Sequence, residues 1–187
     1  MTQSPKFETT QSKFTFNCII VGILIAGIYG FFHDQITYQI SHEYYTEFKF
    51  GKFGFLSSDI PDWILVSKIG FLATSWIGLI AGWFIAKVSF IKGDLVKSYK
   101  LFLKGFAILI TFSIFMATCF ALINKLLPFK TKASLSGYFS LNPSELEAFS
   151  LVGNIHHGGS LGAVFGLIAS VSFLHIITKT LYPLDSN

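Results

Sequence analysis

The stretch Phe14–Phe32 reads FTFNCIIVGILIAGIYGFF and holds nineteen residues without a charge. About 20 apolar residues, rising about 1.5 Å each, cover the hydrocarbon core of a bilayer, so this stretch predicts a transmembrane helix. A cleaved signal peptide also combines a basic start with an apolar run. Here the run exceeds the roughly 7–15 residues usual for such a leader, and the tail before it has no A-x-A-like site. We therefore expect an uncleaved helix.

Three further apolar segments follow, and we expect four helices at about 14–32, 63–86, 101–123 and 158–179. Residues 1–13 and 183–187 form short tails around one membrane domain, 14–182. The long connections 33–62 and 124–157 are expected to build a cap on one side of it. Composition agrees, because the chain is 52% hydrophobic and 13% charged, whereas a soluble domain carries about 25% charged residues. The fold class predicted is an all-α bundle of four transmembrane helices.

The two connections carry local signals of their own. The run Asn142-Pro143-Ser144-Glu145 offers an N-cap, a proline at the first helical position and a capping-box glutamate. It predicts a short helix that ends at Gly153. In the first connection, Phe48-Lys49-Phe50 and Phe53-Gly54-Phe55 alternate in a way typical of a hairpin or an aromatic loop at the lipid interface. The helical spacing of apolar residues from Tyr29 to Ile40 is compatible with two further turns of the first helix.

Lysines set the predicted orientation. All 14 basic residues are lysine, which removes the bidentate clamps that arginine supplies. No basic run is interleaved with aromatic residues, so nucleic acid is not an expected partner. The N-terminal tail, the region 87–104 and the C-terminal end with Lys179 together hold eight lysines, and the long connections hold five. Because cytoplasmic segments retain positive charge, both termini are expected in the cytoplasm and the cap outside the membrane.

Small residues recur at four-residue steps in every predicted helix, where they favour close approach of helices in lipid. They are Gly22, Ala26 and Gly30; Gly70, Thr74, Gly78 and Gly82; Ser113, Ala117 and Ala121; and Gly158, Gly162, Gly166 and Ser170. Trp76, deep in the second segment, is interpreted as a packing residue whose indole N–H is satisfied by a neighbouring helix. The pattern predicts a tightly packed bundle.

Side chains capable of chemistry gather after the first helix and before the last. The candidate metal ligands are His33, Asp34, Glu43, His156 and His157. Imidazole and carboxylate groups together suit zinc or another divalent metal. Their spacing matches no strong metal motif, and adjacent histidines on a helix point about 100° apart. Both His156 and His157 would serve one site only in the irregular backbone that Gly158-Gly159 permits.

Three interpretations of this cluster remain open: a metal site, a hydrogen-bonded group that fixes the outer loop on the bundle, and a catalytic centre or ligand pocket. An enzyme is less favoured, because the chain has no G-x-S-x-G elbow, P-loop or G-x-G-x-x-G run. A proton-coupled transporter usually needs an ionisable group within the hydrocarbon zone. All ten acidic residues lie outside the predicted spans or at their edges, so a small permease is the weakest reading.

Four patches resemble a family of small bacterial integral membrane proteins with an H-D-Q-[IV]-[ST]…E-Y-F-T signature. They are His33-Asp34-Gln35-Ile36-Thr37, Glu43-Tyr44-Tyr45-Thr46 with Phe48-Lys49-Phe50, Ala73-Thr74-Ser75-Trp76-Ile77-Gly78, and Asn154-Ile155-His156. The chain departs from the pattern at Tyr45, where the family carries phenylalanine, and at His157-Gly158-Gly159-Ser160, where it carries asparagine and an aromatic. The resemblance implies a four-helix architecture and a bacterial inner membrane, and it assigns no activity.

The first functional hypothesis is a non-catalytic component of a membrane assembly whose outer polar cluster docks a partner or ligand. Its partners would be the lipid bilayer and either further copies of itself or other membrane subunits. The alternative is a metal-binding protein or metal-dependent enzyme with an extracytoplasmic site. Its cofactor would be a divalent metal.

Overall fold

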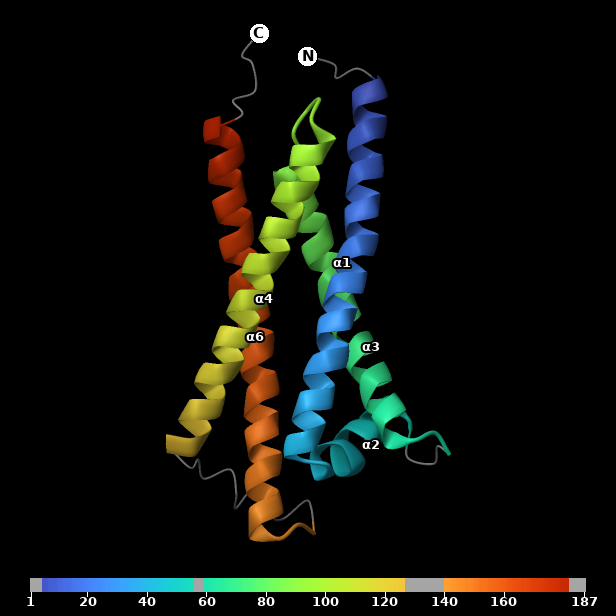
Figure 1. Cartoon of the computed structure of the whole chain (residues 1–187), viewed down its shortest axis with the longest axis vertical. Coiled ribbons are helices and arrows are strands. Elements are labelled where there is room, and N and C mark those ends of the chain that lie inside the picture. The colour runs from blue at the N-terminus through green and yellow to red at the C-terminus, as the bar shows by residue number, and fades with distance from the viewer. Residues whose placement is uncertain (1–4, 56–58, 127–139, 182–187) are drawn as a thin grey trace.

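Four long helices form most of the protein (Figure 1). The structure is a computed structural model and describes residues 5–55, 59–126 and 140–181, within which there is no strand. The helices are α1 (Pro5–Ile40), α3 (Asp62–Ser89), α4 (Leu95–Leu126) and α6 (Pro143–Leu181). Each is long and apolar enough to cross a membrane, with mean hydropathy of 2.0, 1.8, 2.5 and 2.0 over the best window. The predicted all-α class with four apolar helices is confirmed, and the chain is a multi-pass membrane protein.

The four helices pack as two pairs, with α1 along α3 and α4 along α6. In the first pair the glycines face each other, and a Cβ on Gly22 would lie 2.6 Å from the carbonyl oxygen of Gly78. Thr74 Oγ1 donates to the Ala26 carbonyl at 2.7 Å across the same seam. Such close backbone approach replaces the hydrophobic drive that lipid does not supply. The predicted small-residue faces of these two helices therefore meet.

The second pair is built in the same way. A Cβ on Gly158 would lie 2.6 Å from the carbonyl oxygen of Met116. Ser113 Oγ donates to the Gly159 carbonyl at 2.9 Å, and Ser170 Oγ donates to the Gly105 carbonyl at 2.7 Å. These two hydroxyl bonds and the glycine contacts hold α4 against α6. Each pair of helices is therefore tightly packed.

Several predicted helix limits differ from the structure. Helix α1 begins at Pro5, within the predicted tail 1–13, and runs past the expected end at residue 32. It ends at Ile40, as the helical spacing from Tyr29 to Ile40 indicated, so His33 and Asp34 are helical. The short helix predicted at Asn142 begins there, since Asn142 Oδ1 accepts from Glu145 N at 3.0 Å and Glu145 Oε2 accepts from Asn142 N at 2.8 Å. It does not end at Gly153 but joins the helix predicted from about residue 158, and the two form one helix, α6, that continues to Leu181. Residues 127–139 of the second predicted cap connection lie outside the described residues. A glycine stops a helix when it takes positive φ, and within the described residues only Gly54 and Gly93 do so.

The first connection folds back over the bundle as a helical cap, and the predicted hairpin is wrong. A π-helix, η1 (Tyr44–Lys49), runs directly into the short helix α2 (Phe50–Phe53). Gly54, at φ 76°, ends α2, and Phe55 N donates to the Phe50 carbonyl at 2.8 Å. A glycine is favoured there because side chains strain this left-handed conformation. Helix α2 lies beside the ends of α1 and α3 (Figure 1).

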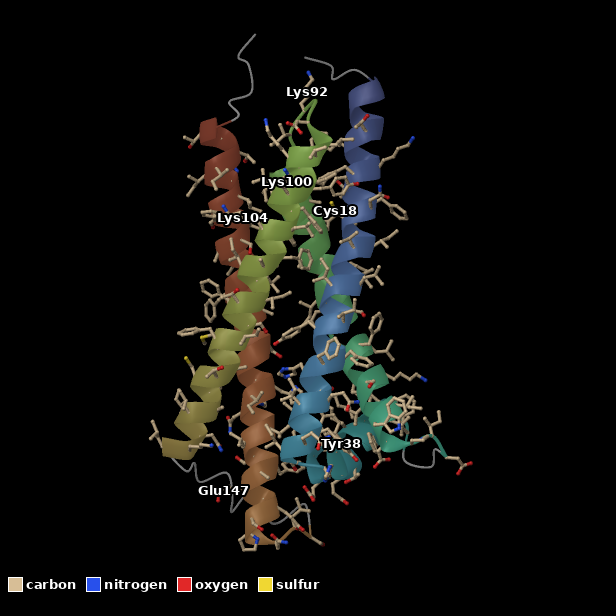
Figure 2. The ribbon with its side chains drawn as sticks, viewed as in Figure 1. Cys18, Tyr38, Lys92, Lys100, Lys104 and Glu147 are labelled. Atoms are coloured by element: carbon tan, nitrogen blue, oxygen red, sulfur yellow. The ribbon has the colours of Figure 1, made fainter. Side chains whose placement is uncertain are left out.

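The first residues of α1 and the last residues of α6 lie at one end of the molecule and the cap lies at the other (Figure 1). Lys92, Lys100 and Lys104 lie toward the end that carries the termini, whereas Tyr38 and Glu147 lie near the opposite end (Figure 2). Aromatic residues bind the cap to the bundle, since Tyr44, Tyr45 and Phe50 share one buried cluster with residues of α3 and α6. The cap is thus a fixed part of the fold.

Candidate metal-binding site

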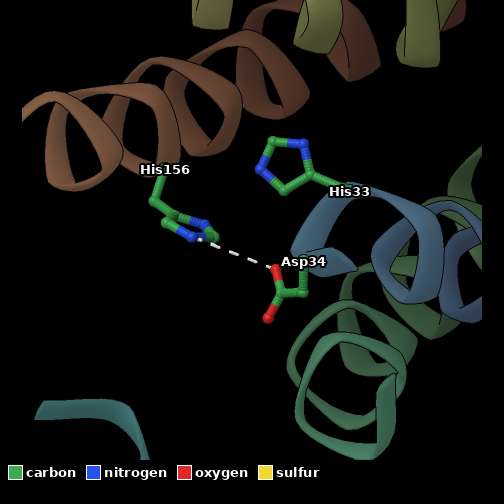
Figure 3. A group of neighbouring side chains, drawn as sticks. All are labelled: His33, Asp34 and His156. Atoms are coloured by element: carbon green, nitrogen blue, oxygen red, sulfur yellow. Dashed lines mark ion pairs between the residues drawn. The ribbon is translucent and has the colours of Figure 1, made fainter. Parts of the chain in front are cut away.

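Three of the predicted ligands come together where α1 faces α6. His33, Asp34 and His156 each offer one ligand atom, and these atoms lie within 4.8 Å of one another. His156 Nε2 is 4.0 Å from Asp34 Oδ1, and the two imidazole rings meet edge to face with centroids 5.0 Å apart (Figure 3). The Asp34 residue is 2% exposed. His33 and Asp34 both lie on the part of α1 that continues past the predicted helix end at residue 32.

Lys49 from the cap completes the charge balance of this group, and the sequence did not single it out as a site residue. Its Nζ donates to Asp34 Oδ2 at 2.9 Å, which leaves Oδ1 facing His156. The Lys49 residue is 8% exposed. Burial lowers the pKa of Lys49 because desolvation penalises the ammonium, and the Asp34 carboxylate opposes this shift. The buried ion pair explains how a carboxylate is tolerated inside the bundle.

The π-helix η1 places Lys49 next to Asp34. In an α-helix a residue and the one five positions later lie about 140° apart. A π-turn closes between residues five apart, so Tyr44 and Lys49 face the same buried side. Such turns are frequent at functional sites. The sequence pattern Phe48-Lys49-Phe50 gave no indication of it, because alternating aromatic residues are also typical of a strand.

Two tyrosines of η1 contact the site, Tyr44 at His156 and Tyr45 at the end of α1. The Tyr44 ring stacks on His156 with centroids 5.2 Å apart and planes 12° apart. The Tyr45 hydroxyl donates to the Asp34 carbonyl at 3.1 Å and lies 2.6 Å from Thr37 Oγ1. Burial raises the pKa of Tyr44 to about 12 and raises the pKa of Tyr45 further. Both phenols therefore stay neutral at physiological pH.

The other two predicted ligands lie apart from this group. Glu43 Oε2 accepts from Ser41 Oγ at 2.9 Å, in the bend that begins the cap. His157 is exposed, and its Nδ1 donates to the Gly153 carbonyl at 2.7 Å. The backbone at Gly158 is helical and not irregular, so His156 and His157 point in different directions. Of the five candidate ligands, the structure therefore brings three together, His33, Asp34 and His156.

A cavity of about 490 Å³ lies beside the three ligands, between the two helix pairs. His33, Asp34 and His156 line its polar end, together with residues of the cap. The walls farther from the cap are apolar, and they include Trp76 of α3. Trp76 is 59% exposed, so its prediction as a buried packing residue is wrong. The site is therefore open to small molecules on one side.

A second cavity, of about 480 Å³, lies on another side of α1 against α4. Tyr29 and His33 line both cavities. The Tyr29 hydroxyl bridges to Ser113 Oγ at 3.4 Å and so marks the partition between them. His33 consequently stands at the junction of the two spaces.

Comparison with known proteins yields no match to a family model, to a curated protein or to a solved structure.

Proposed function

We propose that this multi-pass membrane protein binds one divalent transition-metal ion through His33, Asp34 and His156. The observation that carries the proposal is the convergence of two imidazoles and a carboxylate within 4.8 Å. This ligand set is typical of zinc and of non-haem iron. Structural zinc sites are closed by four protein ligands, whereas catalytic sites keep a position open. Three ligands beside a cavity therefore favour a metal that binds or activates a small molecule.

The surroundings of the ligands support the proposal. Metal-binding carboxylates are usually held by a second hydrogen bond that fixes their orientation. Lys49 supplies that bond to Asp34 Oδ2, on the carboxylate oxygen that does not face His156. Tyr44 restricts the ring of His156 by stacking on it. Small movements of the side chains would bring all three ligand atoms to the distances of about 2.0–2.2 Å that zinc requires.

Elemental analysis of protein purified in detergent without chelator tests the proposal. We expect about one equivalent of a divalent metal, lost in His33→Ala and in His156→Ala. His175→Ala is the matched control, because this histidine is exposed on α6 near the end of the helix that carries the C-terminus. Metal content that is equal in all four proteins would overturn the metal site.

A second candidate function has its own observation. The Lys49–Asp34 ion pair and the Tyr45 hydrogen bonds fix the cap on the bundle without any ion. The same cluster would then be structural, within a non-catalytic component that assembles with itself or with other membrane subunits. In that case His33→Ala and His156→Ala lower the melting temperature, the metal content stays at background, and a stoichiometric partner or second copy copurifies.

We also infer that the protein resides in a bacterial inner membrane with both termini in the cytoplasm. Lys92, Lys100 and Lys104, in and after the α3–α4 turn, lie toward the end opposite the cap. Cytoplasmic segments are enriched in lysine, so this distribution supports an extracytoplasmic cap and metal site. The resemblance to small bacterial membrane proteins supports the same placement.

A further inference from the structure

The cavity beside the metal ligands has two chemically different ends. Residues at its apolar end belong to the middle of the helices, and they include Trp76, Ile77, Phe106 and Ile110. Along α1 the lining runs from Ala26 to Asp34, which is about 12 Å of helix. The cavity is thus an elongated space whose polar end lies at the cap and whose apolar end lies at membrane depth.

The polar end carries more positive than negative groups. Lys49 and Lys52 contribute two ammonium groups and Asp34 contributes the one carboxylate among the lining residues. Lys52 is exposed, and its Nζ lies 5.7 Å from the centre of the Phe48 ring, at the rim of the cavity. Imidazole nitrogens of the histidines add hydrogen-bonding capacity. This end is therefore suited to an anionic oxygen group.

The cavity is open at membrane depth. Trp76 of α3 and Ser160 of α6 line it and are both exposed, and both lie within candidate membrane spans. Molecules that enter between these helices come from the bilayer and not from water. A ligand must therefore dissolve in lipid and still carry a polar head.

We propose that this cavity binds an amphiphile from the bilayer that has an acyl chain and one anionic oxygen headgroup, a carboxylate or a phosphate. The headgroup lies against Lys49, Lys52 and His156, and the chain lies along Trp76 and Ile110. The binding does not depend on the metal, although a metal held by His33, Asp34 and His156 would present its open position to the same headgroup.

The headgroup must supply most of the affinity. An acyl chain that moves from lipid to an apolar protein wall gains little, because both surroundings are apolar. Hydrogen bonds to a charged group are stronger, and the low dielectric of the site strengthens them further. We therefore expect a fatty acid to bind at least about tenfold more tightly than its methyl ester, which lacks the charge.

Quenching of Trp76 fluorescence tests the proposal directly. The starting protein carries Trp63→Phe and Trp83→Phe; both side chains are exposed and neither lines the cavity. It is kept in chelator and in a detergent without bromine, and titrated with stearic acid brominated at mid-chain. We expect saturable quenching, with the brominated methyl ester at least tenfold weaker. Quenching that rises without saturation and equally for acid and ester reports partition into the micelle and would overturn the proposal.

Phosphatidic acid with brominated chains forms a parallel arm of the titration. Tighter binding of this lipid identifies a phosphate headgroup, and tighter binding of stearic acid identifies a carboxylate. If neither brominated lipid gives saturable quenching in chelator, the cavity is rejected as an amphiphile site. The proposal of a metal site is unaffected by that result, because metal content is measured separately.

Matched variants place the ligand in the cavity. Ala163→Phe fills the space from α6, and Ser160→Phe blocks its exposed rim where little packing is disturbed. We expect both to weaken binding of the acid at least tenfold. Ala107→Phe is the control, because Ala107 is exposed on α4 and does not line the cavity. Folded Phe variants that bind the acid as tightly as the control would place the ligand elsewhere and overturn the proposal.

Discussion

At the scale of single residues, the ion pair between Asp34 and Lys49 decides whether the site is stable. Both residues are nearly inaccessible, at 2% and 8% exposure. A buried pair contributes little net stability compared with apolar residues, but loss of one partner leaves a buried charge uncompensated. The pair therefore matters most when it is broken.

We predict that Lys49→Met lowers the free energy of unfolding by about 3–5 kcal/mol, because the Asp34 carboxylate loses its only ammonium partner among the described residues. The double variant Asp34→Asn/Lys49→Met removes both charges and should recover part of this loss. Unfolding by denaturant in detergent measures both, and the coupling energy follows from the double-mutant cycle. Additive effects of the two substitutions would contradict a direct interaction.

Three of the residues that converge were singled out from the sequence, and Lys49 was not. His33, Asp34 and His156 were identifiable because imidazole and carboxylate groups are rare next to apolar helices. Lys49 was not, because a lysine near the membrane surface is ordinary and its burial depends on how the cap folds. Glu43 carries the same carboxylate group as Asp34 and was also a candidate ligand. In the structure it accepts a hydrogen bond from Ser41 and lies apart from the site.

At the scale of elements, the close contact between α4 and α6 is the feature most sensitive to mutation. A Cβ at Gly166 would lie 2.8 Å from Leu109 Cα, which is main chain and cannot rotate away. We predict that Gly166→Leu separates the two helices and lowers the melting temperature in detergent by several degrees. The loss arises because dispersion contacts fall off within about 1 Å of added separation.

The control for this prediction lies two positions further along the same helix. Ile168 is 59% exposed, so Ile168→Leu faces lipid and should leave the melting temperature nearly unchanged. The opposite order of stability, or equal melting of the two variants, would show that the glycine face is not a helix contact in detergent.

Four long apolar helices were predictable because composition and length dictate them, and the capping box at Asn142 marked where a helix begins. The start of α1 at Pro5 and the passage of α6 through Gly153 were not predicted. A glycine within a helix and a glycine that ends one look alike in sequence, and packing of neighbours such as Val152, 0% exposed, decides between them. The π-turn of the cap has no comparable local signature.

At the scale of the whole molecule, the orientation in the membrane fixes which compartment the proposed metal site faces. We predict that a cysteine at Ser140, exposed near the cap, labels with an impermeant maleimide in intact cells. A cysteine at Val96, 67% exposed at the opposite end, should label only after permeabilisation. The native Cys18 and Cys119 are replaced by alanine and serine in this background. Labelling at Val96 in intact cells would place the site in the cytoplasm.

The pairing of α1 with α3 and of α4 with α6 has a consequence for biosynthesis. Each pair consists of neighbours along the chain, so the first hairpin can close while the second is still being translated. His33 and Asp34 are then in place before His156 has been made. Only docking of the two hairpins brings the three proposed ligands together, so the proposed metal site forms after the second hairpin has been made. At a hundred times its Kd, the ion would then stabilise the finished assembly by about 2.7 kcal/mol.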